Sequence, residues 1–178
     1  MLNFPFHFQY GYHFDSVLIG NFLRRRAKEI GVEHIEATVQ DVEQNSNGDI
    51  KSLKLNNNQT LSGDFFIDCS GFASVLLQKT LKVPFLNFAE NLFNDSAIAM
   101  PTEIEPNIPS ETVSTALTNG WAWKIPLTNR FGNGYVYSSK YCSPDEAETE
   151  LRAHLGVLDS DIEARHLKMK VGRAEESW

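Results

Sequence analysis

The sequence predicts a mixed fold, α+β or α/β, and three observations support it. Two segments, near residues 15–30 and 143–155, begin with cap residues and repeat apolar side chains every three or four positions, which is typical of amphipathic helices. Short segments of alternating polarity lie between turns containing Asn and Gly, which predicts antiparallel strands. One of these strands, 120–126, carries two of the chain's three tryptophans. A chain of 178 residues is long enough to bury a core under such elements.

Composition excludes several classes of function. The formal net charge of -7 argues against nonspecific nucleic-acid binding, which needs clustered Lys and Arg. No apolar segment approaches the length of a membrane span, and residues 1–10 lack the basic start of a signal peptide. Cys69, Cys142 and the five His show no metal-ligand spacing. We therefore expect no metal site, no membrane or nucleic-acid partner, and a cytoplasmic protein with reduced thiols.

The first predicted helix follows an aromatic, extended lead-in over residues 1–14. Asp15 caps the helix, which runs to about Ile30 and stops at Gly31. His13 is tempting as a catalytic base, but a packed or helix-capping histidine is the better interpretation. Because a globular domain rarely starts with so many aromatic side chains, we expect earlier sequence to cover them.

A meander of three strands is expected next. The strands cover residues 32–42, 50–55 and 61–68, and Asn47-Gly48 is the strongest hairpin signal in the chain. The third strand ends in the apolar run 65–67, which predicts burial on both faces of its sheet.

Asp68-Cys69-Ser70-Gly71 follows this strand and precedes a short predicted helix over residues 73–81. A strand, a turn of small residues and a helix form a place where backbone N–H groups can approach a ligand. The alternative is a tight turn that binds nothing.

The second half of the chain is predicted to be mainly antiparallel. Residues 84–109 contain four prolines and are expected to form an irregular linking segment. Strands are expected over 111–118 and 120–126, then a turn over 129–134 and a strand over 135–137.

The last part of the chain holds the second helix and one more strand. The helix over residues 143–155 begins with a capping box, and a strand is expected within 162–171. The polar end of the sequence has no clear terminating element, so we expect further sequence beyond it.

Trp121 and Trp123 occupy alternate positions, so both indoles should point to one side of an extended strand and form a flat wall. Ile125 continues that side, and Pro126 ends the regular pairing. The simplest alternative is an ordinary hydrophobic sheet face whose aromatic residues fill a core.

The pattern W-x-W-x-I-P over residues 121–126 resembles the motif of the flavin-dependent tryptophan halogenases. Residues 12–15 and 66–71 resemble the middle portion of a flavin monooxygenase-type FAD-binding fold, and 130–136 and 171–173 also fit the halogenase pattern. The similarity runs along nearly the whole chain, so the chain is expected to be an internal fragment of such a protein.

The resemblance implies two incomplete parts. Residues 1–84 would be part of the FAD-binding domain, with the helix, the meander and the Asp68–Gly71 turn. Residues 85–178 would be the substrate-side antiparallel sheet and helix. The family's glycine-rich phosphate loop, its lysine and its glutamate have no counterpart in this chain, so the chain alone is expected to be inactive.

The chemistry implied by the resemblance is halogenation of an aromatic ring. Reduced FAD, supplied by a separate flavin reductase, reacts with oxygen to give a flavin hydroperoxide. This oxidises chloride or bromide to hypohalous acid, which travels through a tunnel to tryptophan or another indole- or phenol-like ring. The tunnel wall would be built by residues that separate flavin from substrate: Trp121, Trp123, Ile125 and Pro126.

The same resemblance places three residues at the cofactor. Val39 would approach the adenine through its backbone, and Ser70 and Gly71 would face the cofactor from their turn. Two other functions remain open: a related FAD-dependent aromatic monooxygenase, and a non-catalytic module that binds an aromatic ligand or a partner. The oligomeric state, a homodimer included, is also open.

Overall fold

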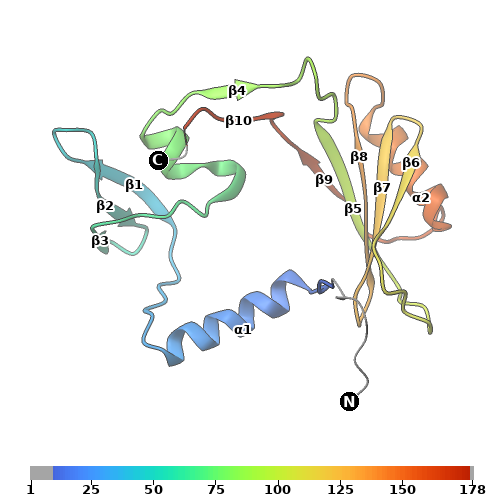
Figure 1. Cartoon of the computed structure of the whole chain (residues 1–178), viewed down its shortest axis with the longest axis horizontal. Helices are drawn as coiled ribbons and strands as arrows, with labels where there is room; N and C mark the ends of the chain where they lie inside the picture. Colours follow the sequence, from blue (N-terminus) through green and yellow to red (C-terminus); the bar gives the residue numbers. More distant parts are fainter. Residues whose placement is uncertain (1–9, 177–178) are drawn as a thin grey trace, which may run out of the picture.

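The computed structural model describes residues 10–176, and Figure 1 shows how its elements are arranged. The helical elements are α1 (Ser16–Glu29), η1 (Gly71–Ala73), η2 (Val75–Thr80) and α2 (Pro144–Leu155). The strands are β1 (Val39–Gln44), β2 (Ile50–Leu55), β3 (Thr60–Ser62), β4 (Phe85–Asn87), β5 (Ser96–Thr102), β6 (Val113–Leu117), β7 (Gly120–Pro126), β8 (Phe131–Tyr137), β9 (Arg165–Lys168) and β10 (Gly172–Ala174). The mixture of helices and antiparallel strands confirms the predicted fold class.

The strands form three antiparallel sheets. Their orders are β1-β2-β3, β10-β4 and β6-β7-β8-β5-β9. In Figure 1 the three-stranded and five-stranded sheets lie at opposite ends of the molecule, and α1 runs between them along one side. The β4-β10 pair makes the connection on the other side.

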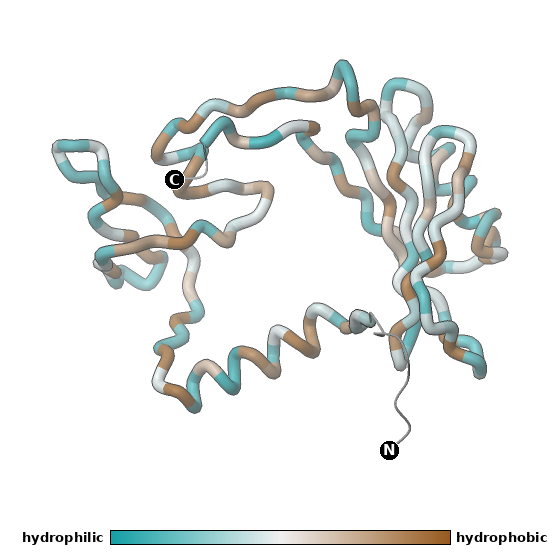
Figure 2. The backbone as a smooth tube through the Cα atoms, viewed as in Figure 1, coloured by the Kyte–Doolittle hydropathy of each residue, from teal (hydrophilic) through white to brown (hydrophobic). Residues whose placement is uncertain are grey.

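Helix α1 begins and ends close to where the sequence predicts. The Asp15 carboxylate accepts hydrogen bonds from the N–H groups of Val17 and Leu18, and Gly31 follows the helix with φ of 91°. Hydrophobic and hydrophilic residues alternate along the helix, as the colours of the tube in Figure 2 show. None of its residues is buried within the described part of the chain.

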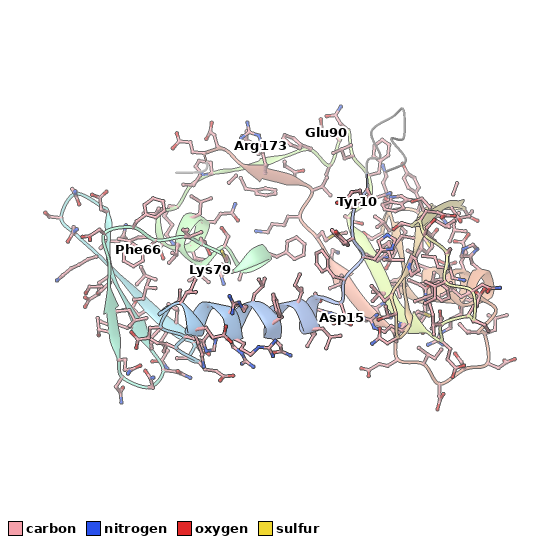
Figure 3. The ribbon with its side chains drawn as sticks, turned by 60° about the horizontal axis from the view of Figure 1, so that its bottom comes forward. Tyr10, Asp15, Phe66, Lys79, Glu90 and Arg173 are labelled. Carbon is pink, nitrogen blue, oxygen red and sulfur yellow. The ribbon has the colours of Figure 1, made fainter. Side chains whose placement is uncertain are left out.

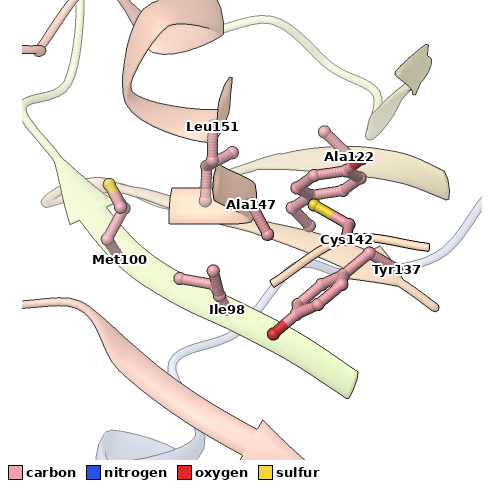
Figure 4. Close-up of a cluster of buried hydrophobic side chains, with 8 residues drawn as sticks. Ile98, Met100, Ala122, Tyr137, Cys142, Ala147 and Leu151 are labelled. Atoms are coloured by element: carbon pink, nitrogen blue, oxygen red, sulfur yellow. The ribbon is translucent and has the colours of Figure 1, made fainter. Parts of the chain in front are cut away.

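The hydrophobic core lies between the five-stranded sheet and α2. Figure 4 shows its side chains, which come from β5, β7, β8, the segment after β8 and α2. The fully buried members include Ile98, Tyr135, Ala147 and Leu151. Residues of one face of the sheet therefore fix α2, which leaves the opposite face for other contacts.

Helix α2 starts at the predicted capping box. The Ser143 hydroxyl accepts a hydrogen bond from Glu146 N–H, and the Glu146 carboxylate accepts one from Ser143 N–H at 2.9 Å. Gly156 ends the helix with φ of 71°.

Replacing Ser143 with alanine is expected to lower the free energy of unfolding by about 1 kcal/mol, because Glu146 N–H then has no side-chain acceptor. Urea unfolding followed by circular dichroism measures this loss. Ser143→Asp is the matched control, since aspartate also caps helices. An equal loss in both variants would contradict the prediction.

The predicted meander is wrong at two of its boundaries. Residues 32–38 are not strand, because pairing with β2 begins only at Val39. Residues 63–68 are also outside a strand, and Phe65 and Ile67 are 82% and 75% exposed rather than buried. Within the described chain β3 pairs with β2 through Thr60–Ser62 alone, so an apolar run without a partner strand stays irregular.

Two predictions in the second half also need correction. The segment 84–109 contains β4 and the central strand β5, although Pro101 lies in β5. Pro101 is tolerated because β9 pairs with β5 only as far as Ala99, so no neighbour needs an N–H at position 101 on that side. The expected turn over 129–134 is shorter, since β8 already begins at Phe131.

The short helix expected over 73–81 has an unusual form. A 3₁₀ turn, η1, is followed by a π-helix, η2. The last expected strand, 162–171, is confirmed as β9, Arg165–Lys168.

Candidate functional site

The two tryptophans of β7 lie on the same side of the strand, as predicted. Trp121, Trp123 and Ile125 alternate with Ala122, which is buried in the core under α2. We call the side with the two indoles the wall face. Pro126 is the last residue of β7 and by alternation lies on the other face, so it ends the wall without belonging to it.

The indole wall is not flat, which corrects the expected shape. The ring centroids of Trp121 and Trp123 are 5.9 Å apart, and the ring planes are tilted by 54°. Trp121 is 42% exposed, whereas Trp123 is half-buried. The two rings therefore have different surroundings, and Trp123 is the more constrained.

Gly134 of β8 explains how Trp123 fits. Gly134 is the direct partner of Trp123 in the ladder between β7 and β8. A Cβ atom on Gly134 would lie 2.0 Å, 2.1 Å and 2.6 Å from three atoms of the Trp123 indole. The indole thus lies against bare backbone, and only glycine leaves room for it. Gly134 was not among the predicted site residues, because its place opposite Trp123 depends on the register between β7 and β8.

Arg130 joins the wall face to the start of α1. Its Nη2 atom donates a hydrogen bond to Asp15 Oδ2 at 2.9 Å, across 115 positions of sequence. Its Nη1 atom lies 3.6 Å from the place where a Cβ of Gly132 would be. Arg130 and Trp123 line the same hollow of about 760 Å³. The guanidinium therefore lies on the wall face, beside the more buried tryptophan.

His13 is exposed rather than packed, and Asp15 rather than His13 caps α1. The Nε2 atom of His13 lies 3.1 Å from the hydroxyl oxygen of Thr112, just before β6. Figure 3 shows Asp15 at the end of α1 nearest the five-stranded sheet. The lead-in to α1 thus contacts this sheet at two places, Thr112 and Arg130.

The other face of the sheet carries a partly buried polar network. The Tyr135 hydroxyl donates to Glu150 Oε2 at 2.8 Å and accepts from Asn119 N–H at 3.0 Å. Glu150 Oε1 accepts from Thr118 N–H at 2.9 Å. Since Thr118 and Asn119 form the turn before β7, this network ties the start of the tryptophan strand to α2.

The turn Asp68–Gly71 is organised by Asp68. One carboxylate oxygen accepts from Ser70 N–H at 3.1 Å and from the Ser70 hydroxyl at 2.5 Å. The other accepts from the N–H groups of Leu76 and Leu77, at 2.9 Å and 3.1 Å. Ser70 Oγ also accepts from Val75 N–H at 2.8 Å. The acid therefore caps η2 and shapes the turn.

These hydrogen bonds have a measurable pH dependence. Burial opposes the charge of Asp68, but the hydrogen bonds from Ser70, Leu77 and Leu76 outweigh it and hold its pKa below the ordinary value of 3.8. A lowered acid pKa stabilises the fold above the unfolded pKa, and this stabilisation is lost as pH falls through the folded pKa.

Replacing Asp68 with alanine is expected to cost about 0.5–2 kcal/mol of unfolding free energy at neutral pH, as for other lost helix caps. The variant should also lose less stability than the original chain when pH falls below about 4, because it lacks this titrating group. Urea unfolding at pH 7 and pH 3 measures both effects. Asp64→Ala is the control, and an identical acid response of Asp68→Ala and the original chain would contradict the assignment.

The predicted cofactor residues lie apart from the indole wall. Val39 starts β1 and pairs with Leu55 in the three-stranded sheet. Gly71 has φ of 60°, and a Cβ there would meet nothing within 4 Å, so this turn presents open backbone. Gly71 lines a hollow of about 340 Å³ together with Lys168 and Lys170, and no tryptophan lines it.

Three further features of the described residues concern metal sites, disulfide bonds and membrane-spanning helices. Within residues 10–176, no group of three or more His, Cys, Asp and Glu side chains is placed to hold a metal ion. Cys69 and Cys142 are both free thiols. Among the helices described, none is long and apolar enough to cross a bilayer.

Comparison with known proteins identifies the family. Residues 3–178 match the family model described as tryptophan halogenase. The chain is 43% identical to a tryptophan 6-halogenase of Streptomyces toxytricini over 96% of its own length and 33% of that protein. It is 39% identical to a tryptophan 7-halogenase of Lentzea aerocolonigenes, over 95% of the chain and 33% of the relative.

Solved structures agree with this match. The crystal structure of the Streptomyces toxytricini tryptophan 6-halogenase superposes with a TM-score of 0.89 at 41% identity, covering 93% of this chain and 33% of that one. A flavin-dependent halogenase from Brevundimonas sp. BAL3 gives 0.86 at 35% identity, covering 93% and 34%. The chain spans about one third of the length of these relatives. The suspected resemblance is confirmed, and the chain belongs to the tryptophan halogenase family.

Proposed function

We propose that this chain supplies the indole wall and part of the flavin-binding region of an FAD-dependent halogenase. The reaction is chlorination or bromination of tryptophan or another indole- or phenol-like ring. The observation that carries the proposal is the seating of Trp123 against Gly134, next to Trp121 on the same strand face. A core-filling aromatic would lie under α2, whereas these two indoles lie on the face away from it.

The wall acts by exclusion. Indole side chains have no titratable proton in the physiological range, so Trp121 and Trp123 neither accept nor deliver one. Two tilted rings 5.9 Å apart form a barrier that an aromatic substrate does not cross, while a small oxidant passes beside it. Ile125 extends the barrier along β7, and Pro126 sets where the strand ends.

The residues expected at FAD fit an extended cofactor through their backbones. The Ser70 hydroxyl is already bonded to Asp68 and Val75, so Ser70 would contribute backbone rather than side-chain contacts. Gly71 leaves open space above its Cα atom, and Val39 offers backbone at the start of β1. Bound FAD, in its reduced form, would activate molecular oxygen, and oxygen would be the oxidant that converts chloride or bromide into a halogenating agent.

The division into two parts, at residues 1–84 and 85–178, belongs to this proposal. Asp15–Arg130 and His13–Thr112 are the side-chain contacts that would join them. We assign no catalytic acid or base to the chain. A separate flavin reductase and a small aromatic substrate are the proposed partners, in a cytoplasmic enzyme.

A chimera tests the proposal. The matching third of the Streptomyces toxytricini tryptophan 6-halogenase, 43% identical, would be replaced by this chain. With reduced FAD, oxygen and chloride, the chimera is expected to bind FAD and to release chlorinated tryptophan, detected by mass spectrometry. The measurement includes the hydroxylated product and the bound flavin.

Two other outcomes would support the alternatives. A folded chimera that releases hydroxytryptophan instead would support the monooxygenase. One that binds no FAD but whose indole fluorescence is quenched by aromatic ligands would support the binding module. The control is the chimera with Lys124→Gln, a change on the same strand but outside the wall face, which should leave the products unchanged.

A further inference from the structure

The turn between β7 and β8 brings the indole wall close to the first helix. Leu127 N–H donates to Arg130 C=O at 2.9 Å, so the turn is closed directly after Pro126. From this turn the Arg130 side chain runs back along the wall face over Gly132. Gly132 and Gly134 are the β8 partners of Ile125 and Trp123. The guanidinium therefore lies on the same face of β8 as the Trp123 indole, two residues along the strand.

Asp15 holds this guanidinium in place while it caps α1. Its Oδ1 atom accepts from Val17 and Leu18 N–H, and its Oδ2 atom accepts from Arg130. The Asp15 side chain is only 12% exposed, and the Arg130 side chain is 39% exposed. Two hydrogen bonds from the backbone hold the Asp15 carboxylate in one orientation. Because the guanidinium is planar, its ion pair with this carboxylate fixes the orientation of the Arg130 side chain as well.

A partly exposed ion pair of this kind contributes little to the free energy of unfolding. The location of Arg130 suggests another role, since Arg130 and Trp123 line the same hollow. Met100, Glu163 and Arg165 also line this hollow, together with smaller residues at Ala99, Pro101 and Gly132. Arg130 is held in place there by its ion pair with Asp15.

We propose that Arg130 is a positioning residue for Trp123. Anchored by Asp15, it fixes the tilt of the Trp123 indole relative to α1. The orientation of the wall face relative to α1 therefore stays constant. Its consequence for catalysis rests on the proposed function, because the wall must stay closed to substrate while FAD is bound. The geometric statement rests on the Asp15–Arg130 ion pair and on the hollow that Arg130 and Trp123 both line.

The indole pair provides a direct readout. Two indoles 5.9 Å apart and tilted by 54° should give an exciton couplet in circular dichroism, and its amplitude depends on their mutual angle. The difference spectrum between the chain and its Trp121→Phe variant isolates this signal. The readout needs neither FAD nor halide, so the inference and the proposed function fail separately.

The experiment compares four substitutions in this 178-residue chain. Arg130→Gln removes the charge, and Asp15→Ser keeps a helix cap but is too short to reach Arg130. Both are expected to lower the couplet amplitude at least twofold with little change in melting temperature. Arg130→Lys should restore part of the amplitude, because lysine still reaches the carboxylate but lacks the planar group.

The matched control is Glu105→Gln. It breaks the ion pair in which Lys124 Nζ lies 2.9 Å from Glu105 Oε1. Lys124 is on the same strand as Trp123. This control should leave the couplet unchanged. An unchanged couplet in Arg130→Gln and Asp15→Ser, or an equal fall in Glu105→Gln, would overturn the assignment. If Arg130→Gln does not fold, Asp15→Ser alone decides between these results.

Discussion

Replacing Gly134 with valine is expected to expel the Trp123 indole from its seat and to destabilise the five-stranded sheet by about 1–3 kcal/mol, the range for overpacked sites. The reason is steric, since even a single Cβ would overlap three indole atoms at 2.0–2.6 Å. The backbone of Gly134 cannot shift away from the indole without breaking strand pairing, because Gly134 pairs with Trp123 on one side and with Ala99 on the other.

The measurement combines urea unfolding with the exciton couplet of Trp121 and Trp123. The folded variant should show a weakened couplet, and in the chimera it should lose halogenated product. Gly132→Ala is the matched control two residues away on the same face, because its Cβ would meet only Arg130 Nη1 at an ordinary 3.6 Å. Should Gly134→Val keep both couplet and stability, the seat described for Trp123 would be wrong.

Replacing Glu150 with alanine is expected to lower the unfolding free energy by about 3 kcal/mol. Two hydrogen bonds to a charged acceptor are lost together, from Tyr135 Oη and from Thr118 N–H, and each is worth about 1.5–3 kcal/mol. The Tyr135 ring is fully buried, so its hydroxyl has no access to water as a substitute acceptor.

The pH dependence has a defined sign. Burial opposes the charge of Glu150, but the hydrogen bonds from Thr118 and Tyr135 lower its pKa below the ordinary 4.5. Its stabilisation is therefore complete above pH 4.5 and is lost as pH falls through the lower, folded pKa. Burial and the Glu150 carboxylate raise the pKa of Tyr135 to about 12, so the phenol stays protonated at neutral pH.

Urea unfolding at pH 7 and at pH 3 checks the Glu150 prediction. The difference between the original chain and Glu150→Ala should be large at pH 7 and smaller at pH 3. Thr149→Ala, an exposed neighbour on α2, is the control and should cost little. A pH-independent difference would show that the loss arises from packing rather than from the charged acceptor.

The sequence predicted the elements that have local signals. Asp15, Ser143 and Gly156 mark helix ends through caps that involve only neighbouring residues, and all three were correct. The shared side of Trp121 and Trp123 follows from strand geometry alone. The family motif then supplied the interpretation that the comparisons confirm.

What the sequence could not show depends on partners distant in the chain. Phe65 and Ile67 are apolar enough for a buried strand, but the described structure gives them no partner strand. The contact between Arg130 and Asp15 spans 115 positions. The role of Gly134 depends on the register between β7 and β8, which fixes the residue that faces Trp123.

Strand β8 has opposite requirements on its two faces. Tyr135 and Tyr137 are buried in the core with residues of α2, where smaller side chains would leave cavities. Gly134 faces the wall, where a larger side chain has no room. In a saturation library of β8, smaller residues should therefore be harmful at Tyr135 and Tyr137, and larger residues should be harmful at Gly134.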